Sequence, residues 1–115
     1  MAFSEIEIKK IEKELQTFNE ARRPPPSIRA QLDFGFRLSG QSVELFELRP
    51  MWRNPEVTQE IPYAKATYVK SQRIWKIYWH RADMKWHRYE PYPQATTLNA
   101  FLEMVAEDEY HCFFG

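Results

Sequence analysis

Glycine is scarce in this chain, with three residues among 115. A loop that cradles phosphate needs several glycines close together, so the sequence offers no such loop. The single cysteine, Cys112, excludes an internal disulfide, and the formal net charge of zero excludes a basic field over the whole molecule. No stretch approaches the ~20 apolar residues of a membrane helix. We therefore expect one domain in the cytoplasm, without membrane contact.

Sequence motifs for catalysis are also missing. There is no serine nucleophile elbow and no metalloprotease pattern, and the charged segment 1–13 does not resemble a signal peptide. We expect no cofactor and no metal, and a binding protein rather than an enzyme. What the chain has in plenty is aromatic residues, at 16%. Each ring removes a large surface from water when it packs.

The first 22 residues contain an amphipathic helix. Apolar residues recur there at spacings of three and four over residues 4–22, which places them on one face. Ser4 and Glu7 form a capping-box pattern at its start. The prolines at 24–26 end the helix, because proline lacks the backbone N–H and disfavours helix in the residue before it.

A second, shorter helix is expected near the other end of the chain. Thr97 is a suitable capping residue, and the apolar spacing continues from there. We expect the helix to end by Ala106, because the acidic residues 107–109 are unfavourable at a helix C-terminus. The apolar tail 110–114 is expected to dock onto the domain.

Between the two helices, apolar and polar residues alternate as they do in strands. The alternation predicts five strands and one long proline-containing loop, at residues 30–38, 43–49, 63–70, 73–81 and 85–89 for the strands and 50–62 for the loop. The expected fold is α+β: an N-terminal helix, a five-stranded antiparallel meander sheet, a short C-terminal helix and the docked tail. Since two helices cover roughly one face of such a sheet, the other face, rich in aromatic residues, would be open to a partner.

The first hairpin has a definite expected register. Pairing Leu38 with Val43 places Phe34 opposite Glu47, so the apolar face receives a carboxylate. Phe46 has the opposite parity. Either both faces of the sheet are partly covered, or a β-bulge shifts the phase.

Two segments of these strands resemble a known family. They are SVELFELRPMW at residues 42–52 and WKIYWHRADMKWHRY at residues 75–89. In sequence and in the order of elements, the chain resembles the uncharacterised bacterial domain of unknown function DUF3024 from the proline run to the last helix. The resemblance implies a single bacterial cytoplasmic domain and no particular catalytic residue. The chain departs from the family at its end, where we would expect a tryptophan-containing tail.

The second half of the strand region is rich in cations. From Tyr63 to Tyr89 there are seven lysines and arginines against one acid, Asp83, whereas residues 90–115 carry five acids and no lysine or arginine. Rings between cations on a sheet are typical of single-strand nucleic-acid binders. Alternatively, the cations are the solvated face of an edge hairpin, or the acidic C-terminal helix neutralises them. The candidate binding residues are His80, Arg81, Lys85, Trp86, His87 and Arg88.

A second candidate site combines Glu47, Arg49, Trp52 and Arg53. Glu47 and Arg49 share a strand face, and such a pair can line a pocket for an anionic ligand with Trp52 as a wall. The alternative is a structural ion pair at the strand exit.

Three histidines and the cysteine raise the question of a metal. His80 and His87 can approach across a hairpin, but extended side chains at His111 and Cys112 diverge. We therefore expect no metal there, and a packed thiol at Cys112.

The expected function is a non-enzymatic interaction module, either a homodimer or an adaptor, acting through the aromatic sheet face. The first alternative is a nucleic-acid-binding domain that uses the basic aromatic hairpin 73–89. The second alternative is a small anionic-ligand binder or enzyme around Glu47, Arg49 and Trp52.

Overall fold

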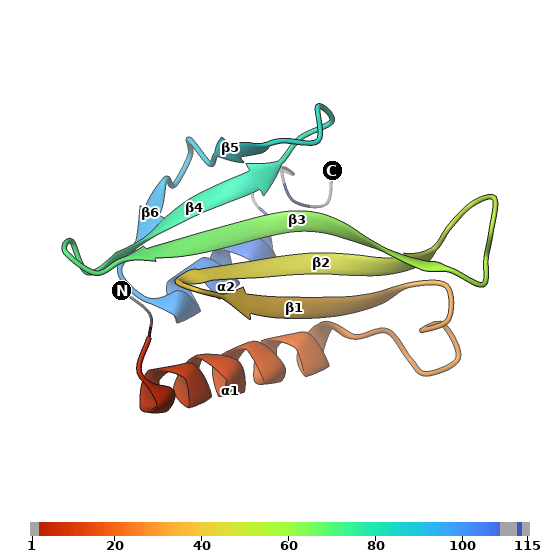
Figure 1. The fold of residues 1–115 in the computed structure, drawn as a ribbon, viewed down its shortest axis with the longest axis horizontal. Helices are drawn as coiled ribbons and strands as arrows, with labels where there is room; N and C mark the ends of the chain where they lie inside the picture. Colours follow the sequence, from red (N-terminus) through yellow and green to blue (C-terminus); the bar gives the residue numbers. More distant parts are fainter. Residues whose placement is uncertain (1–2, 109–112, 114–115) are drawn as a thin grey trace.

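The computed structural model describes residues 3–108 and residue 113, and it has the predicted α+β architecture. The elements are α1 (Glu5–Arg22), β1 (Asp33–Ser39), β2 (Ser42–Pro50), β3 (Thr58–Val69), β4 (Ile74–His80), β5 (Trp86–Arg88), β6 (Gln94–Ala95) and α2 (Leu98–Glu107). The strands form one antiparallel sheet in the order β1-β2-β3-β4-β5, and the short β6 pairs with β4 (Figure 1). The predicted meander of five strands is confirmed.

Helix α1 begins as predicted. The Ser4 hydroxyl accepts a hydrogen bond from the backbone N–H of Glu7, and the Glu7 carboxylate accepts one from the backbone N–H of Ser4. The helix ends before the proline run, and Arg23 then donates to both carboxylate oxygens of Asp33, at 2.9 and 2.7 Å. This ion pair fixes the helix end to the start of β1.

The first hairpin has the expected register. Leu38 pairs with Val43 and Phe34 pairs with Glu47. Of the two explanations offered for the opposite parity of Phe46, the first holds: Phe46 is buried on the other face of the sheet. A β-bulge does lie beside it in the β2–β3 pairing, but the β1–β2 register has no shift, so the bulge does not change the parity of Phe46. Tyr63 is the extra residue of this bulge.

Several predicted boundaries are wrong. The third strand starts at Thr58 rather than residue 63, so the loop predicted at 50–62 is confined to 51–57. The first strand starts at Asp33 rather than residue 30, because backbone hydrogen bonds from Gln31 and Leu32 to Ile28 form turns there. The second helix continues to Glu107, one residue further than predicted.

Smaller differences concern the ends of the hairpins and one strand that was not predicted. β4 covers Ile74–His80 and β5 covers Trp86–Arg88, so each is shorter than predicted. The pairing of β6 with β4 was missed, because two residues between prolines and threonines give no alternation to detect.

Both helices lie on the same face of the sheet. Leu15 of α1 and Phe101 of α2 are fully buried in one core together with Leu45 and Ile77 of the sheet. In Figure 1 the helix α2 lies behind the strands, while α1 runs along β1. The opposite face carries no helix among the described residues.

Of the predicted docked tail, the structure describes Phe113. Its ring is buried, with a centroid 4.8 Å from that of Tyr89, and its N–H donates to Asp108. The remaining tail residues, 109–112 and 114–115, lie outside the described residues. No helix in the described part of the chain is long and apolar enough to cross a membrane.

Candidate functional site

The face of the sheet opposite the helices mixes rings with charges, and we call it the open face. Strand alternation and the observed pairing assign its members. They include Arg37, Glu44, Phe46, Leu48, Glu60, Lys65, Lys76, Tyr78, His80, Trp86 and Arg88. None of the large apolar side chains that are strongly exposed in the described residues lies on this face. It is therefore not a flat apolar surface.

Lys65 is the centre of a cluster over β3, β4 and β5. Its ammonium nitrogen lies 5.1 Å from the ring centroid of Tyr78 and 4.9 Å from that of Trp86. Arg88 of β5 pairs directly with Tyr78, and Lys76 shares the same face. A cation between two rings is attracted by the negative faces of both. We call these five residues the cationic cluster.

The cationic cluster is not neutralised within the described residues. None of its three cations has a carboxylate within 4.0 Å there. The acidic helix α2 packs against β3, β4 and β6 from the helix-covered face. The sheet therefore separates the acids of α2 from these cations, instead of α2 lying across them.

The other half of the open face, over β1, β2 and the start of β3, has one cation between two carboxylates. Arg37 Nη2 lies 2.7 Å from Glu60 Oε1, and Nη1 lies 3.7 Å from Glu44 Oε2. The guanidinium carbon stands 5.0 Å from the ring centroid of Phe46. The open face thus has a half in which the cation is paired with carboxylates and a cationic half.

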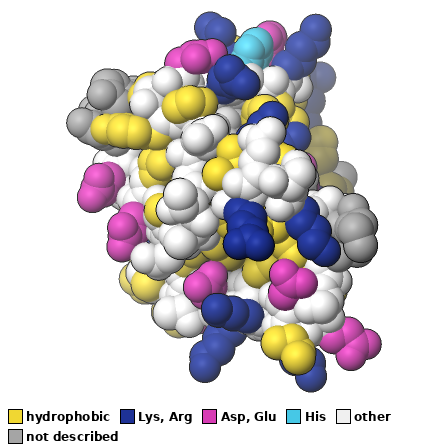
Figure 2. Space-filling view, turned by 90° about the vertical axis from the view of Figure 1, so that its left-hand side faces the viewer, with side chains coloured by type: hydrophobic (Ala, Val, Ile, Leu, Met, Phe, Trp, Pro, Cys, Tyr) yellow, Lys and Arg dark blue, Asp and Glu magenta, His cyan; other side chains and the backbone are white. Residues whose placement is uncertain are grey.

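A hollow of about 240 Å³ lies at the edge of β5, and we call it the β5-edge hollow. It is lined by Trp79, Arg81, His87, Arg88, Glu90 and Pro91. The guanidinium carbon of Arg81 stands 5.2 Å from the ring centroid of Trp79. Figure 2 shows lysine and arginine side chains around a histidine at the top of the molecule, on the side of β4 and β5, with acidic side chains among them.

Asp83, the single acid of the basic hairpin, is engaged inside the β4–β5 turn. Its Oδ2 lies 2.7 Å from Nε2 of His87, and its Oδ1 accepts the backbone N–H of Lys85 at 3.0 Å. The hydrogen bond from His87 holds the pKa of Asp83 below its ordinary value. Both carboxylate oxygens of Asp83 therefore have a partner within the turn.

The other predicted hairpin residues occupy different places. His80 lies on the open face, with its ring edge-on to Trp86 at a centroid distance of 5.0 Å. His87 lies on the opposite face, so the two histidines do not converge. Lys85 is exposed in the turn.

A metal site does not emerge from the part of the chain that the structure describes. No group of three or more His, Cys, Asp or Glu side chains there is placed to hold an ion. His111 and Cys112, which entered the sequence argument, lie outside the described residues.

The second predicted site separates into two local pairs. Arg49 Nε donates to Glu47 Oε2 at 2.7 Å, and the Glu47 side chain is 17% exposed. Trp52 is 86% exposed, and the Arg53 guanidinium stands 5.4 Å from its ring. This geometry is that of a strand-exit ion pair and an exposed loop tryptophan.

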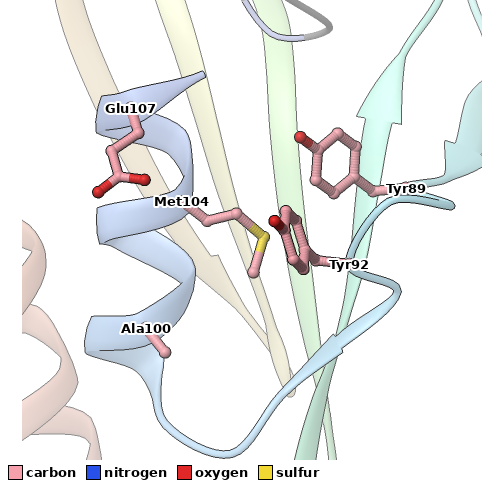
Figure 3. Close-up of a pocket in the computed structure, with 5 residues that line it drawn as sticks. All are labelled: Tyr89, Tyr92, Ala100, Met104 and Glu107. Atoms are coloured by element: carbon pink, nitrogen blue, oxygen red, sulfur yellow. The ribbon is translucent and has the colours of Figure 1, made fainter. Parts of the chain in front are cut away.

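The hollows on the helix side of the sheet include two that are lined by residues of α2 beyond its first residue. In the first, of about 180 Å³, Met104 projects from α2 towards Tyr92 and Tyr89, with Glu107 above (Figure 3). The second, of about 390 Å³, lies between α1 and α2 and includes Phe18 and Leu102. The first is lined by a carboxylate and no cation, and the second is mainly apolar, so neither matches the chemistry of the cationic cluster.

Comparison with known proteins places the chain in a family. A family model described as domain of unknown function (DUF3024) matches residues 3–115. The chain belongs to that family. The resemblance that segments 42–52 and 75–89 carry is confirmed; in the DUF3024 chain they form β2 with its exit and the β4–β5 hairpin. No curated protein and no solved structure matches it.

Sequence reasoning placed Trp86 and Arg88 of the DUF3024 chain among the candidate residues but left out Lys65 and Tyr78. The sequence could have indicated both residues, because Lys65 and Tyr78 are cross-strand neighbours once the register of the β3–β4 hairpin is known. Sequence reasoning also left out Trp79 as a candidate, although the segment 75–89 that carries the family resemblance contains it. Its place in the β5-edge hollow depends on how the chain turns after β4.

Proposed function

We propose that the DUF3024 chain is a non-enzymatic interaction module that binds single-stranded nucleic acid on the cationic half of its open face. The observation that carries the proposal is the position of the Lys65 ammonium between the rings of Tyr78 and Trp86, beside Lys76 and Arg88. A cytoplasmic location is part of the proposal, and the lone cysteine supports it.

The chemistry of the cationic cluster suits this ligand. Bases stack on aromatic side chains without regard to sequence, because every base has a π face. Phosphates between the bases attract lysine and arginine, and their counterions are released on binding. Lys65, Lys76 and Arg88 are free of ion pairs within the described residues, so phosphates would not displace an internal carboxylate.

A homodimer or a protein adaptor on the same face is the second candidate. Two half-buried rings, Tyr78 and Trp86, support it, on a sheet face that no helix of the described residues covers. The charges support it less, because two copies meeting through their cationic halves would bring like charges together, which costs binding energy. Light scattering that shows a monomer at tens of micromolar would count against the dimer.

The deciding experiment is fluorescence anisotropy with labelled oligo-U and oligo-dT across a salt series. We expect binding at low salt that weakens as salt rises, with a slope of about 0.7 for each phosphate contact. Lys65→Gln should lower the slope by about one contact. Trp86→Leu should weaken binding by the stacking of about one base, or 1–3 kcal/mol.

The matched control is Lys9→Gln, which removes the same charge from an exposed position on α1. It should leave both affinity and slope unchanged. Absence of binding at low salt would end the proposal. So would equal losses in Lys65→Gln and Lys9→Gln, because these would indicate attraction to overall charge rather than to the cationic cluster.

A further inference from the structure

The β5-edge hollow adjoins the cationic cluster, and Arg88 belongs to both. We propose that this hollow binds the terminal, phosphate-bearing nucleotide of an RNA strand that lies on the open face. The inference rests on the proposed function and adds to it a preference for one strand end.

The hollow offers two guanidinium groups. Arg81 and Arg88 both line it, and neither has a carboxylate within 4.0 Å among the described residues. Guanidinium groups bind phosphate oxygens in a bidentate manner. A terminal phosphate monoester carries more negative charge than an internal diester, because its second ionisation occurs near pH 6. Two guanidiniums in one hollow therefore favour the end of a strand over its middle.

Asp83, the acid of the β4–β5 turn, forms no ion pair within 4.0 Å with either arginine, although its charge interacts with that of Arg81. Asp83 is held by the His87 ring on one oxygen and by the N–H of Lys85 on the other. One of these contacts comes from the turn that follows β4 and the other from β5, so both oxygens of this carboxylate are occupied by the hairpin that supplies Arg81. Arg81 is thereby left to pack over Trp79, with its guanidinium carbon 5.2 Å from the ring centroid.

Trp79 and Glu90 supply the remaining groups of a nucleotide site. The half-buried indole of Trp79 gives a surface for one base, together with the stacked guanidinium of Arg81. The Glu90 carboxylate lines the same hollow. A carboxylate accepts hydrogen bonds from ribose hydroxyl groups. Glu90 thus favours ribose over deoxyribose.

The test compares oligo-U strands that carry a 5′-phosphate, a 3′-phosphate or hydroxyl groups at both ends. With the full chain, we expect one phosphorylated end to bind about tenfold more tightly than the hydroxyl strand, as charge-assisted bidentate bonds would give. Oligo-dT with the same phosphate should show a smaller preference. Adenosine 5′-monophosphate, titrated alone, should shift the Trp79 indole N–H resonance.

Variants assign the preference to the hollow. Arg81→Gln and Arg88→Gln should each remove the end preference. The matched control is Arg73→Gln, in the β3–β4 turn at the other end of β4, which should keep it. Lys65→Gln should weaken all strands alike while the end preference persists.

The outcomes separate the two proposals. If phosphorylated and hydroxyl strands bind equally and Lys65→Gln still weakens both, the end site is refuted and the proposed function stands. If no strand binds, the proposed function falls and the end site with it, unless adenosine 5′-monophosphate shifts the Trp79 resonance in the wild type and not in Arg81→Gln. That result would support the hollow as a free nucleotide site.

Discussion

Gly35 lies directly under the ring of Phe46. A Cβ built at position 35 would stand 2.5 Å from Cε2 of that ring, closer than real Cβ atoms approach. The two residues pair across β1 and β2 on the open face, where Phe46 is 7% exposed and Arg37 packs over it. The missing side chain at position 35 is what allows a large ring to be buried on a face that no helix covers.

Gly35→Ala should therefore destabilise the domain. The added methyl group displaces the ring of Phe46, and overpacking of this kind costs about 1–3 kcal/mol. The measurement is the free energy of unfolding from urea titration. Phe46→Leu, combined with Gly35→Ala, should recover part of the loss, because the shorter side chain leaves room for the methyl group.

The control is Gly40→Ala, in the β1–β2 turn. No atom lies within 4 Å of a Cβ there, but its φ of +60° costs a non-glycine residue about 1–2 kcal/mol. Phe46→Leu should not alter this loss. If the effects of Gly35→Ala and Phe46→Leu were simply additive, the two residues would not be coupled in the way that their geometry requires.

The features that sequence reasoning predicted are those that short-range rules determine. A period of two over residues 34–47, with one tight turn, leaves a single register for the first hairpin. Ser4 and Glu7 are three residues apart, which is the spacing that a capping box requires. In both cases the information lies within a few neighbouring residues.

The start of β3 at Thr58 could not be predicted from neighbouring residues in this way. Residues 58–61 are mostly polar, and Pro62 argues against a strand interior because proline lacks an N–H. The structure accommodates Pro62 beside the bulge at Tyr63, where the β2–β3 register shifts. This accommodation depends on β2, so no local pattern in β3 reveals it.

The candidate site depends on still longer connections. Lys65 meets Trp86 only because β4 lies between their strands, and that arrangement uses two hairpin registers at once. The β4–β5 turn contains Met84 at a φ of 65°, a conformation that its residue type does not suggest. Charge counting therefore includes Lys65 among the cations of residues 63–89 but does not show that it lies against the rings of Tyr78 and Trp86.

Asp33→Asn should weaken the domain at neutral pH and not in strong acid. The hydrogen bond from Arg23 holds the pKa of Asp33 below 3.8. The ion pair therefore contributes its full stability above the ordinary pKa of the carboxyl group, and the contribution is lost as pH falls through the lowered value. Asparagine can still accept the N–H of Phe34, but it lacks the second acceptor oxygen that Arg23 Nη2 uses, so the substitution removes the charge together with one hydrogen bond of the ion pair.

The measurement for this ion pair is urea unfolding of the wild type and Asp33→Asn between pH 7 and strongly acidic pH. The two curves should converge in acid. Glu20→Gln is the control, since Glu20 makes a longer contact to the same arginine, at 3.5 Å, and its side chain is half exposed. A gap between wild type and Asp33→Asn that did not change with pH would show that the charge of Asp33 is not what stabilises the fold.

Tyr63→Phe should make the domain more resistant to alkali. Burial raises the pKa of Tyr63 well above its ordinary value, so the folded state holds the neutral phenol. The phenol of Tyr63 favours the folded state fully below about pH 10. This contribution to the free energy of unfolding is lost as pH rises further, because the phenol ionises more readily in the unfolded chain. The difference in unfolding free energy between Tyr63→Phe and wild type should grow in favour of the variant above that pH. A difference that stays constant with pH would contradict the prediction.

Trp52→Ser should leave both the fold and nucleic-acid binding unchanged. Trp52 is the most exposed large apolar side chain among the described residues, and it lies in the β2–β3 loop, away from the β3–β5 half of the open face. Surface substitutions of this kind change stability by no more than about 0.5 kcal/mol. Iodide should quench a smaller fraction of the tryptophan fluorescence in the variant, because the exposed Trp52 is gone. Oligonucleotide should quench a larger fraction, because Trp86 is one of the three tryptophans that remain. Loss of oligonucleotide binding in Trp52→Ser would instead place the binding site at the loop, beside Arg53, and would contradict the assignment to the cationic cluster.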